Sequence, residues 1–519
     1  MRSLTAMTFP SVSPLARLSV LLLAAGVLSA CNLAPVYQRP GAPVPTTFDS
    51  ASSTNAPAEF TAQPVEAADW ALLPWQEWVQ DTRLRELMET ALDHNRDLRV
   101  AVANIERARA LYGVQRADQL PTINASGQGS RTRTAEDLRS ATTAATSNQF
   151  NVQLGLASYE LDFWGRVRNL GDVALQQYLQ VEENRRSVQL GLMADIANTW
   201  VALAADQRRL QLARDTLATR EHGYSLTQRM HALGATNGLV LAQNQTVVET
   251  ARSDVAAYES QVQRDRNALQ LLVGQAVPDS LLPLPPKPSL TVQDLKAAGS
   301  GQLQANATPQ VLDATAFTAL TVVPAHLSSA VLLTRPDIVA AEHALQAQYA
   351  SIGAARAAFF PSISLTANVG TASNELSGLF DVGNRVWSFV PQIRLPIFDA
   401  GRNQANLDVA KANREVALAQ YEKAIQVAFR EVGDALADRV TMQRRLQSQT
   451  ALVQSASKVL QLSQARFKAG ADDFLTVLDA QRSLYAAQQT QITLLQAEQV
   501  NRIALYKSLG GGWENAAGQ

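Results

Sequence analysis

The sequence has almost none of the residues on which enzyme active sites and metal centres are usually built. Among 519 residues there is one cysteine, Cys31, so no intramolecular disulfide can form, and the five histidines are scattered along the chain. The histidines lack the short spacing of metal ligands. The three glycines at 510–512 lack the lysine and the serine or threonine of a phosphate-binding loop. We therefore expect no catalysis, no cofactor and no metal.

An excess of charge of one sign is also absent. The 45 basic and 46 acidic residues give a formal net charge of −1. A nucleic-acid partner usually requires a basic face, so none is expected. Aromatic residues make up only 6% of a chain that is 46% hydrophobic. This composition is more typical of long helices than of an α/β enzyme core.

Uninterrupted apolar runs long enough for a transmembrane helix are absent beyond the N-terminus. Residues 1–30 are typical of a lipoprotein signal peptide, because two arginines precede an apolar core, Leu18–Leu28, that is too short to span a bilayer. The core ends in LSAC, so we expect cleavage before Cys31 and covalent lipid, diacylglyceryl and N-acyl, on that residue. A buried free thiol is the alternative. Asn32 follows in place of the aspartate that retains lipoproteins in the inner membrane, which favours the outer membrane.

The sequence contains two copies of one repeat unit. Residues 97–121 match residues 337–361 at an offset of 240, and from Gly165 onward the offset is 236. The offset changes only after Pro121, where a surface loop can vary in length. Such an ordered series of matches establishes an internal repeat. The paired positions include Gly113 with Gly353, Gly165 with Gly401, Gly234 with Gly470 and Gly274 with Gly510.

Each copy contains segments in which apolar and polar residues alternate with a period of two, which is the pattern of a strand. We predict one β-hairpin at about 121–163 and another at about 361–398, with polar loops at 132–147 and 373–384. Tilted strands of about ten residues cross a bilayer. A soluble β-sandwich is the alternative for this feature alone.

Proline is absent from 122 to 277 and after Pro396, and very long helices are predicted there. Residues 166–230 alone would form roughly 100 Å of helix, too long to be buried against a compact core. Apolar residues recur every seven positions, which indicates coiled-coil packing: Leu446, Val453, Leu460 and Phe467. We predict two antiparallel helical hairpins with ends near 234–238 and 470–474. An ordinary helical bundle is the alternative.

The boundaries define six segments. They are a signal peptide at 1–30, a lipidated N-terminal segment at 31–95, a first repeat at 96–274, an inter-repeat segment at 275–335, a second repeat at 336–510 and a tail at 511–519. The segments outside the repeats are predicted to form an equatorial belt around the helices.

Four strands cannot close a membrane barrel, since the smallest closed barrels have about eight. Open edges in lipid leave backbone groups unpaired. The chain must therefore assemble with copies of itself. Three copies would supply twelve strands, although the sequence does not itself distinguish three copies from two or four.

Several motifs in the mature chain are distinctive: the LSAC lipobox, CNLAPVYQRP after it, FDAGRN at 398–403, AGADDFLTVLDAQRSLYAAQ at 469–488 and LYKSLGGGW at 505–513. They resemble those of the TolC-like outer-membrane factors, and most closely the lipidated OprM-like (NodT) branch. The resemblance covers the chain from Cys31 to about Trp513. It implies a mainly α fold with membrane β structure: a trimer with a 12-stranded outer-membrane β-barrel and a periplasmic α-barrel of roughly 100 Å.

In that family the second hairpin bends inward and closes the periplasmic end of the channel. The resemblance places this gate at Leu475 as an apolar plug, Asp479 as an acidic ring and Arg482 one turn away. Three Asp479 carboxylates on one axis would repel each other unless protonated or bound to cations, and would favour cations. TolC has an arginine and an aspartate where this chain has Asp472 and Thr476, so its particular salt-bridge lock is not expected here. A solvated charge cluster at a helix end is the alternative.

The hairpin ends are the implied contacts with a periplasmic adaptor, because glycine permits the chain reversal and short side chains admit another helix end. The implied contact residues are Gly234, Ala235, Gly470, Ala471 and Asp472. The resemblance also implies an inner-membrane transporter, commonly of the RND class.

The expected function is that of a passive, gated exit duct for drugs and other small molecules in a tripartite efflux system. Such a duct is lipid-anchored in the outer membrane and spans the periplasm. A type I protein-secretion duct of the same fold is the main alternative. A coiled-coil lipoprotein scaffold that conducts no ions is a third possibility.

Overall fold

The computed structural model describes residues 32–48, 74–140, 144–286, 320 and 328–511. The predicted signal peptide, Cys31 and parts of the predicted belt and tail lie outside the described residues. The chain folds as two compact units. The first comprises residues up to 41, 104–182 and 340–421, and the second comprises 42–103, 183–339 and the residues from 422 onward.

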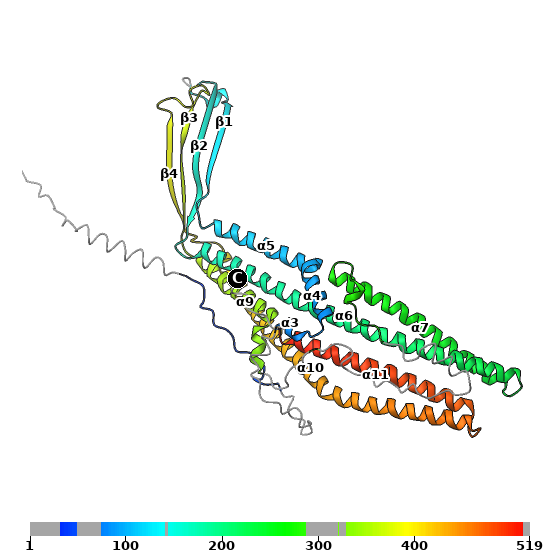
Figure 1. The fold of residues 1–519 in the computed structure, drawn as a ribbon. Helices are drawn as coiled ribbons and strands as arrows, with labels where there is room; N and C mark the ends of the chain where they lie inside the picture. The colour runs from blue at the N-terminus through cyan, green and yellow to red at the C-terminus, as the bar shows by residue number, and fades with distance from the viewer. Residues whose placement is uncertain (1–31, 49–73, 141–143, 287–319, 321–327, 512–519) are drawn as a thin grey trace, which may run out of the picture. The chain divides into compact units, whose positions relative to one another are not determined.

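The first unit contains a four-stranded antiparallel sheet in the order β1-β2-β3-β4, seen side by side in Figure 1. The strands are β1 (Ile123–Arg133), β2 (Thr146–Leu161), β3 (Ser362–Ser373) and β4 (Arg385–Arg394). The four predicted strands are thereby confirmed, although β2, at 16 residues, is longer than the ten expected. Strands β2 and β3 pair across the two repeats, and Gly370 makes this possible, because a Cβ there would lie 2.1 Å from the carbonyl oxygen of Val152.

One face of this sheet is apolar and exposed on all four strands. Strand alternation places Ile123, Leu154, Val369 and Trp387 on this face, in paired or diagonal positions, and the Trp387 side chain is 78% exposed. The opposite face is polar, where Ser388 Oγ donates a hydrogen bond of 2.8 Å to Asn368 Oδ1. A sheet that is apolar outside and polar inside fits a membrane barrel wall.

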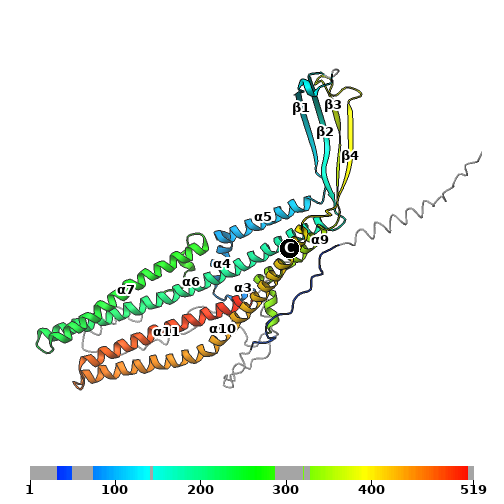
Figure 2. The same ribbon diagram turned by 180° about the vertical axis from the view of Figure 1, so that it is seen from behind.

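Long helices fill the rest of the two repeats, and their bounds agree to within one residue after the predicted offsets. The first repeat has α5 (Arg96–Ala117), α6 (Arg166–Ala232) and α7 (Gly238–Val273), and the second has α9 (Pro336–Ala357), α10 (Arg402–Lys468) and α11 (Phe474–Ser508). In the second unit α7 lies against α6 and α11 against α10 as antiparallel hairpins in both views (Figures 1 and 2). The predicted helical hairpins are confirmed.

The core of the second unit forms where α6 meets the short helices α3 (Trp75–Trp78) and α4 (Thr82–His94). Trp78 stacks on Tyr506 at 4.1 Å between ring centroids, and Trp200 Nε1 donates to the Leu281 carbonyl oxygen at 3.2 Å. Helix α6 contains a window apolar and long enough to cross a membrane, but 61% of that window is buried inside the protein. Burial inside the protein accounts for the apolar character of this window.

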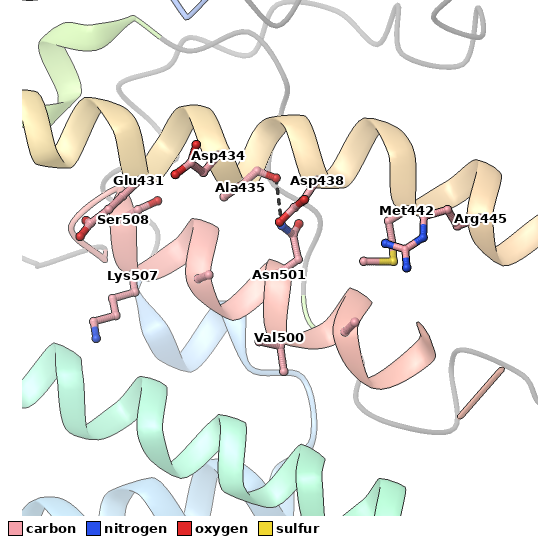
Figure 3. Close-up of a pocket in the computed structure, with 12 residues that line it drawn as sticks. Glu431, Asp434, Ala435, Asp438, Met442, Arg445, Val500, Asn501, Lys507 and Ser508 are labelled. Carbon is pink, nitrogen blue, oxygen red and sulfur yellow. Dashed lines mark hydrogen bonds between the residues drawn. The ribbon is translucent and has the colours of Figure 1, made fainter. Parts of the chain in front are cut away.

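A groove of about 600 Å³ lies between α10 and α11 (Figure 3). Asn501 Nδ2 donates across it to the Ala435 carbonyl oxygen at 2.9 Å, as the dashed line in Figure 3 shows. Acidic side chains predominate along its α10 side, including Asp434 and Asp438. In the described part of the chain, no three His, Cys, Asp or Glu residues are grouped so that they could hold a metal ion.

Two buried aspartates face each other between α6 and α7. Burial, followed by the interaction with the Asp206 carboxyl, raises the pKa of Asp265 to about 6. Asp265 accepts a hydrogen bond from Gln261 Nε2 at 2.8 Å, but its Oδ2 is buried without a partner. Asp206 is paired with Arg209 at 2.5 Å. A proton on Asp265 would satisfy Oδ2 by bonding it to Asp206, so the neutral form of Asp265 is favoured.

This pair predicts an unusual pH dependence of stability. Because the pKa of Asp265 in the folded protein is raised above its unfolded value of about 3.9, its stability contribution is lost as pH rises from about 4 to about 6. Asp265→Asn resembles the protonated form and should lack this fall, becoming more stable than wild type by about 1–3 kcal/mol above pH 6. Melting temperatures of wild type and Asp265→Asn in detergent at pH 4.5, 6.0 and 7.5 measure this difference in stability.

The control is Asp408→Asn, which removes an exposed carboxylate that accepts from Gln404 at the same i, i+4 spacing. Its melting temperature should still fall with pH as the wild type does. Parallel wild-type and Asp265→Asn curves would contradict the shared-proton account.

Candidate functional site

The two helical hairpins end in turns with the same backbone structure. Gly234 and Gly470 both have φ +70°, a conformation that costs other residues about 1–2 kcal/mol. One residue further on, the Ala235 amide donates to the Met230 carbonyl oxygen and the Ala471 amide to that of Arg466, at 2.8 and 2.9 Å. These bonds are those of a Schellman motif, which satisfies the final carbonyl groups of α6 and α10.

The next helix of each hairpin begins with a side-chain cap. Asn237 Oδ1 accepts from the Val240 amide at 3.0 Å, and Asp473 Oδ1 accepts from the Thr476 amide at 3.1 Å. Capping by Asn or Asp stabilises a helix start by about 1 kcal/mol. The caps are equivalent in geometry, but the first is neutral and the second carries a carboxylate.

The second turn has an additional ion pair that sequence reasoning missed. Arg466 holds Asp472 with two hydrogen bonds, of 2.6 and 2.8 Å. The hydrogen bond from Arg466 lowers the pKa of Asp472. Thus Asp472 braces the turn, while Gly470 and Ala471 are exposed beside it with open space around Gly470. The signal was present, since Arg466 lies on the last turn before a glycine reversal.

The three predicted gate residues lie along one exposed stripe of α11, with spacings of four and three residues. Asp479 and Arg482 are about two-thirds exposed and Leu475 is 36% exposed, whereas Val477 and Leu478 are buried on the other side. Arg482 Nη2 donates to Asp479 Oδ1 within the same chain. Asp479 is therefore not an isolated acid, because Arg482 places a positive charge beside it on this stripe.

A half-buried cluster one turn further along α11 joins the second hairpin to the first, and sequence reasoning missed it. The Tyr485 hydroxyl donates to Asp254 Oδ2 on α7 at 3.0 Å, and the Tyr258 hydroxyl on α7 donates to Gln489 Oε1 at 2.7 Å. Burial, then the Asp254 carboxylate, raises the pKa of Tyr485, so it remains a donor at neutral pH. The guanidinium of Arg220 on α6 lies over the Tyr485 ring, 5.3 Å from its centroid. No local motif pairs residues 231 positions apart.

These contacts give the stripe on α11 a defined position. The start of α11 is fixed by its cap and by the braced turn, and Tyr485 ties the following turns to α7. Leu475, Asp479 and Arg482 lie between these two attachments. They can move together only if the Tyr485 bond breaks or the turn is deformed.

The comparisons with known proteins agree on one group. The family model described as outer membrane efflux protein matches residues 87–275 and 327–511. The toluene efflux pump outer membrane protein TtgC of Pseudomonas putida is 41% identical over 501 residues, which cover 96% of each chain. A membrane protein of Pseudomonas aeruginosa has a crystal structure with a TM-score of 0.80 and 38% identity, covering 92% of this chain and 100% of that one. The open-state MtrE outer membrane channel of Neisseria gonorrhoeae has a TM-score of 0.77 and 36% identity. The match covers 93% of this chain and 98% of that one.

Removing the Tyr485 hydroxyl should loosen the start of α11. Tyr485→Phe loses a bond to a charged acceptor and leaves Asp254 without that donor, at a cost of about 1.5–3 kcal/mol. Amide hydrogen exchange over residues 474–487 should accelerate by roughly tenfold or more. Tyr258→Phe is the matched control, since it removes a neutral bond in the same cluster and should have a smaller effect. An equal or larger effect of Tyr258→Phe would contradict a special role for Tyr485.

Proposed function

Because the chain belongs to the outer membrane efflux protein family, we propose that three copies of it form the exit duct of a tripartite efflux pump. It is an outer-membrane protein, as its relatives are. The observation that carries the proposal is a sheet with an exposed apolar face and two free edge strands, β1 and β4. In lipid, each unpaired backbone group costs several kcal/mol, so these edges require partners.

Closure by copies of the chain satisfies both edges at once. When β4 of one copy pairs with β1 of the next, three copies give a ring of twelve strands from four in each chain. A ring of that size exceeds the eight or so strands that side chains can fill, and leaves a water-filled bore. The polar face with Asn368 and Ser388 then lines the bore.

In the proposed duct a lipid anchor on Cys31 is followed by residues that are held against α9. The Leu33 carbonyl oxygen accepts from Arg356 Nη1 on α9 at 3.0 Å. Arg39 donates two hydrogen bonds, of 2.8 and 2.6 Å, to the buried carboxylate of Glu342, also on α9. The segment behind the anchor is thus fastened to the first unit.

The gate of the duct is assigned to the stripe of Leu475, Asp479 and Arg482 on α11. On a three-fold axis, three such stripes would place a ring of apolar side chains beside a ring of acid–base pairs. The ends of the hairpins at Gly234, Ala235, Gly470, Ala471 and Asp472 are assigned to a periplasmic adaptor, which links the duct to an inner-membrane RND transporter.

The proposed cargo is drugs and other small molecules. Relatives are named for the efflux of toluene and of antibiotics. The duct is passive, and no cofactor other than the lipid on Cys31 is assigned to it. Protein cargo, as in a type I secretion duct, is the alternative to small-molecule cargo.

Single-channel conductance in a planar bilayer tests the duct and its gate. Wild type should show a small, cation-preferring conductance. Asp479→Ala leaves the positive charge of Arg482 without its partner, so the cation preference should fall or invert. Asp408→Ala, which breaks a similar i, i+3 pair with Lys411 on α10, is the control and should conduct as wild type does. A well-folded trimer that never conducts would contradict the duct and favour a coiled-coil scaffold.

Drug tolerance in a deletion strain tests the adaptor contact and the cargo. The wild-type gene should restore tolerance, and Ala471→Trp should not, because a bulky side chain blocks the approach of another helix end. Ala451→Trp, an exposed alanine far from the turn along α10, is the control and should restore it. Full tolerance with Ala471→Trp would remove this residue from the interface. Loss of protein secretion without loss of drug tolerance would favour the type I alternative.

A further inference from the structure

The two hairpin loops of the sheet lie at the same end, next to its free edges. The first loop, residues 134–145, of which 134–140, 144 and 145 are described, joins β1 to β2, and the second loop, residues 374–384, joins β3 to β4 (Figure 1). Because the strand order is β1-β2-β3-β4, the second loop ends at one free edge and the first loop begins at the other. If β4 of one copy pairs with β1 of the next, the second loop of one copy meets the first loop of its neighbour.

The second loop is a folded element rather than an open connection. Asn384 Nδ2 donates to the Gly378 carbonyl oxygen at 2.6 Å, and the Asp381 amide donates to the same oxygen at 3.1 Å. Leu379 is only 4% exposed, so the loop buries one of its own apolar side chains. The loop therefore holds its outward side chains in fixed places.

Three of those outward side chains are large and apolar. Leu376 is 67% exposed, Phe380 75% and Val382 fully exposed. Within one chain the first loop does not cover these three side chains. This is so even though the first loop is joined to β2, the strand beside β3. The first loop offers a matching residue, since Leu138 is 79% exposed at the end of the short 3-10 helix Glu136–Leu138.

Acidic residues lie in the second loop, and two arginines lie at the end of β1 that leads into the first loop. The second loop carries Glu375 and Asp381 and no basic residue. Arg131 and Arg133 lie at the end of β1, whereas the first loop itself carries Arg139 beside two acids, and Arg385 follows the second loop at the start of β4. In the described part of the chain none of these charged side chains forms an ion pair. Opposite charges therefore face the seam from its two sides without partners in a single chain.

We propose that the second loop of one copy docks onto the first loop of the next copy, with Leu376, Phe380 and Val382 packed against Leu138. Arg131 and Arg133, at the end of β1, then lie on the opposite side of the seam from Glu375 and Asp381. This contact rests on the proposed trimeric barrel and adds a side-chain lock to the β4–β1 seam. Such a lock matters because a one-residue slip in strand pairing would turn every apolar side chain to the wrong face.

The scarcity of cysteine makes this contact directly testable. Leu138→Cys and Phe380→Cys are introduced together into the full chain, in which Cys31 is the one natural cysteine. Mild oxidation in isolated outer membranes, followed by denaturing non-reducing electrophoresis, should yield covalent dimers and trimers that a reductant dissolves. Each single variant should remain monomeric. The control pair Phe380→Cys with Leu233→Cys has similarly exposed side chains and should form no ladder.

The result separates this contact from the assembly on which it rests. A trimer on native gels, with normal conductance but without a ladder, would overturn the docking of the loops and leave the duct intact. A monomer whose mobility shifts on oxidation would show that the two loops of one chain pair instead, and would also overturn it. If the thiol of the Phe380→Cys variant is protected from a maleimide in membranes but not in the detergent-purified trimer, again without a ladder, the surface would be assigned to lipopolysaccharide. Absence of any trimer would contradict both proposals.

Discussion

Backbone hydrogen bonding at the two edges of the sheet is the constraint on which the architecture depends. Strands β1 and β4 each present a row of unpaired amide and carbonyl groups, and lipid offers them no water. The polar inner face, the apolar outer face and the loops beside the seam are all consistent with closure by further copies. A chain with the same helices and a closed sheet of its own would have no reason to associate in this way.

The two helical hairpins share their backbone geometry because they belong to an internal repeat, and they differ in chemistry where their residues differ. Helices α6 and α10 have the same length of 67 residues, and their turns share one backbone structure. Yet only the second turn carries the Arg466–Asp472 brace, and only α11 carries the stripe with Asp479. The repeat therefore builds two hairpins with the same backbone, and the residues that differ between them give only the second hairpin the charged stripe to which the gate of the proposed duct is assigned.

The architecture could be predicted from the sequence because long-period patterns encode it. Alternating apolar and polar residues predict the strands, apolar residues at every seventh position predict the coiled coils, and glycines predict the turns. Together these patterns predict both kinds of hairpin. The tertiary contacts could not be predicted in this way. Tyr485 and Asp254 are separated by 231 positions, and Asp206 and Asp265 meet only because two helices face each other. The pairing of Arg482 with Asp479 follows from helical spacing, and was within reach of sequence reasoning.

The neutral and acidic caps of the two turns have a consequence for symmetry. In the proposed trimer the hairpin ends form six turns that are alike in backbone, but Asn237 and Asp473 alternate around the ring. The backbone of this ring of turns thus has approximate six-fold symmetry, whereas its charges have only three-fold symmetry. A partner built from six identical subunits would meet two kinds of neighbour, so its subunits must adopt two binding modes in strict alternation.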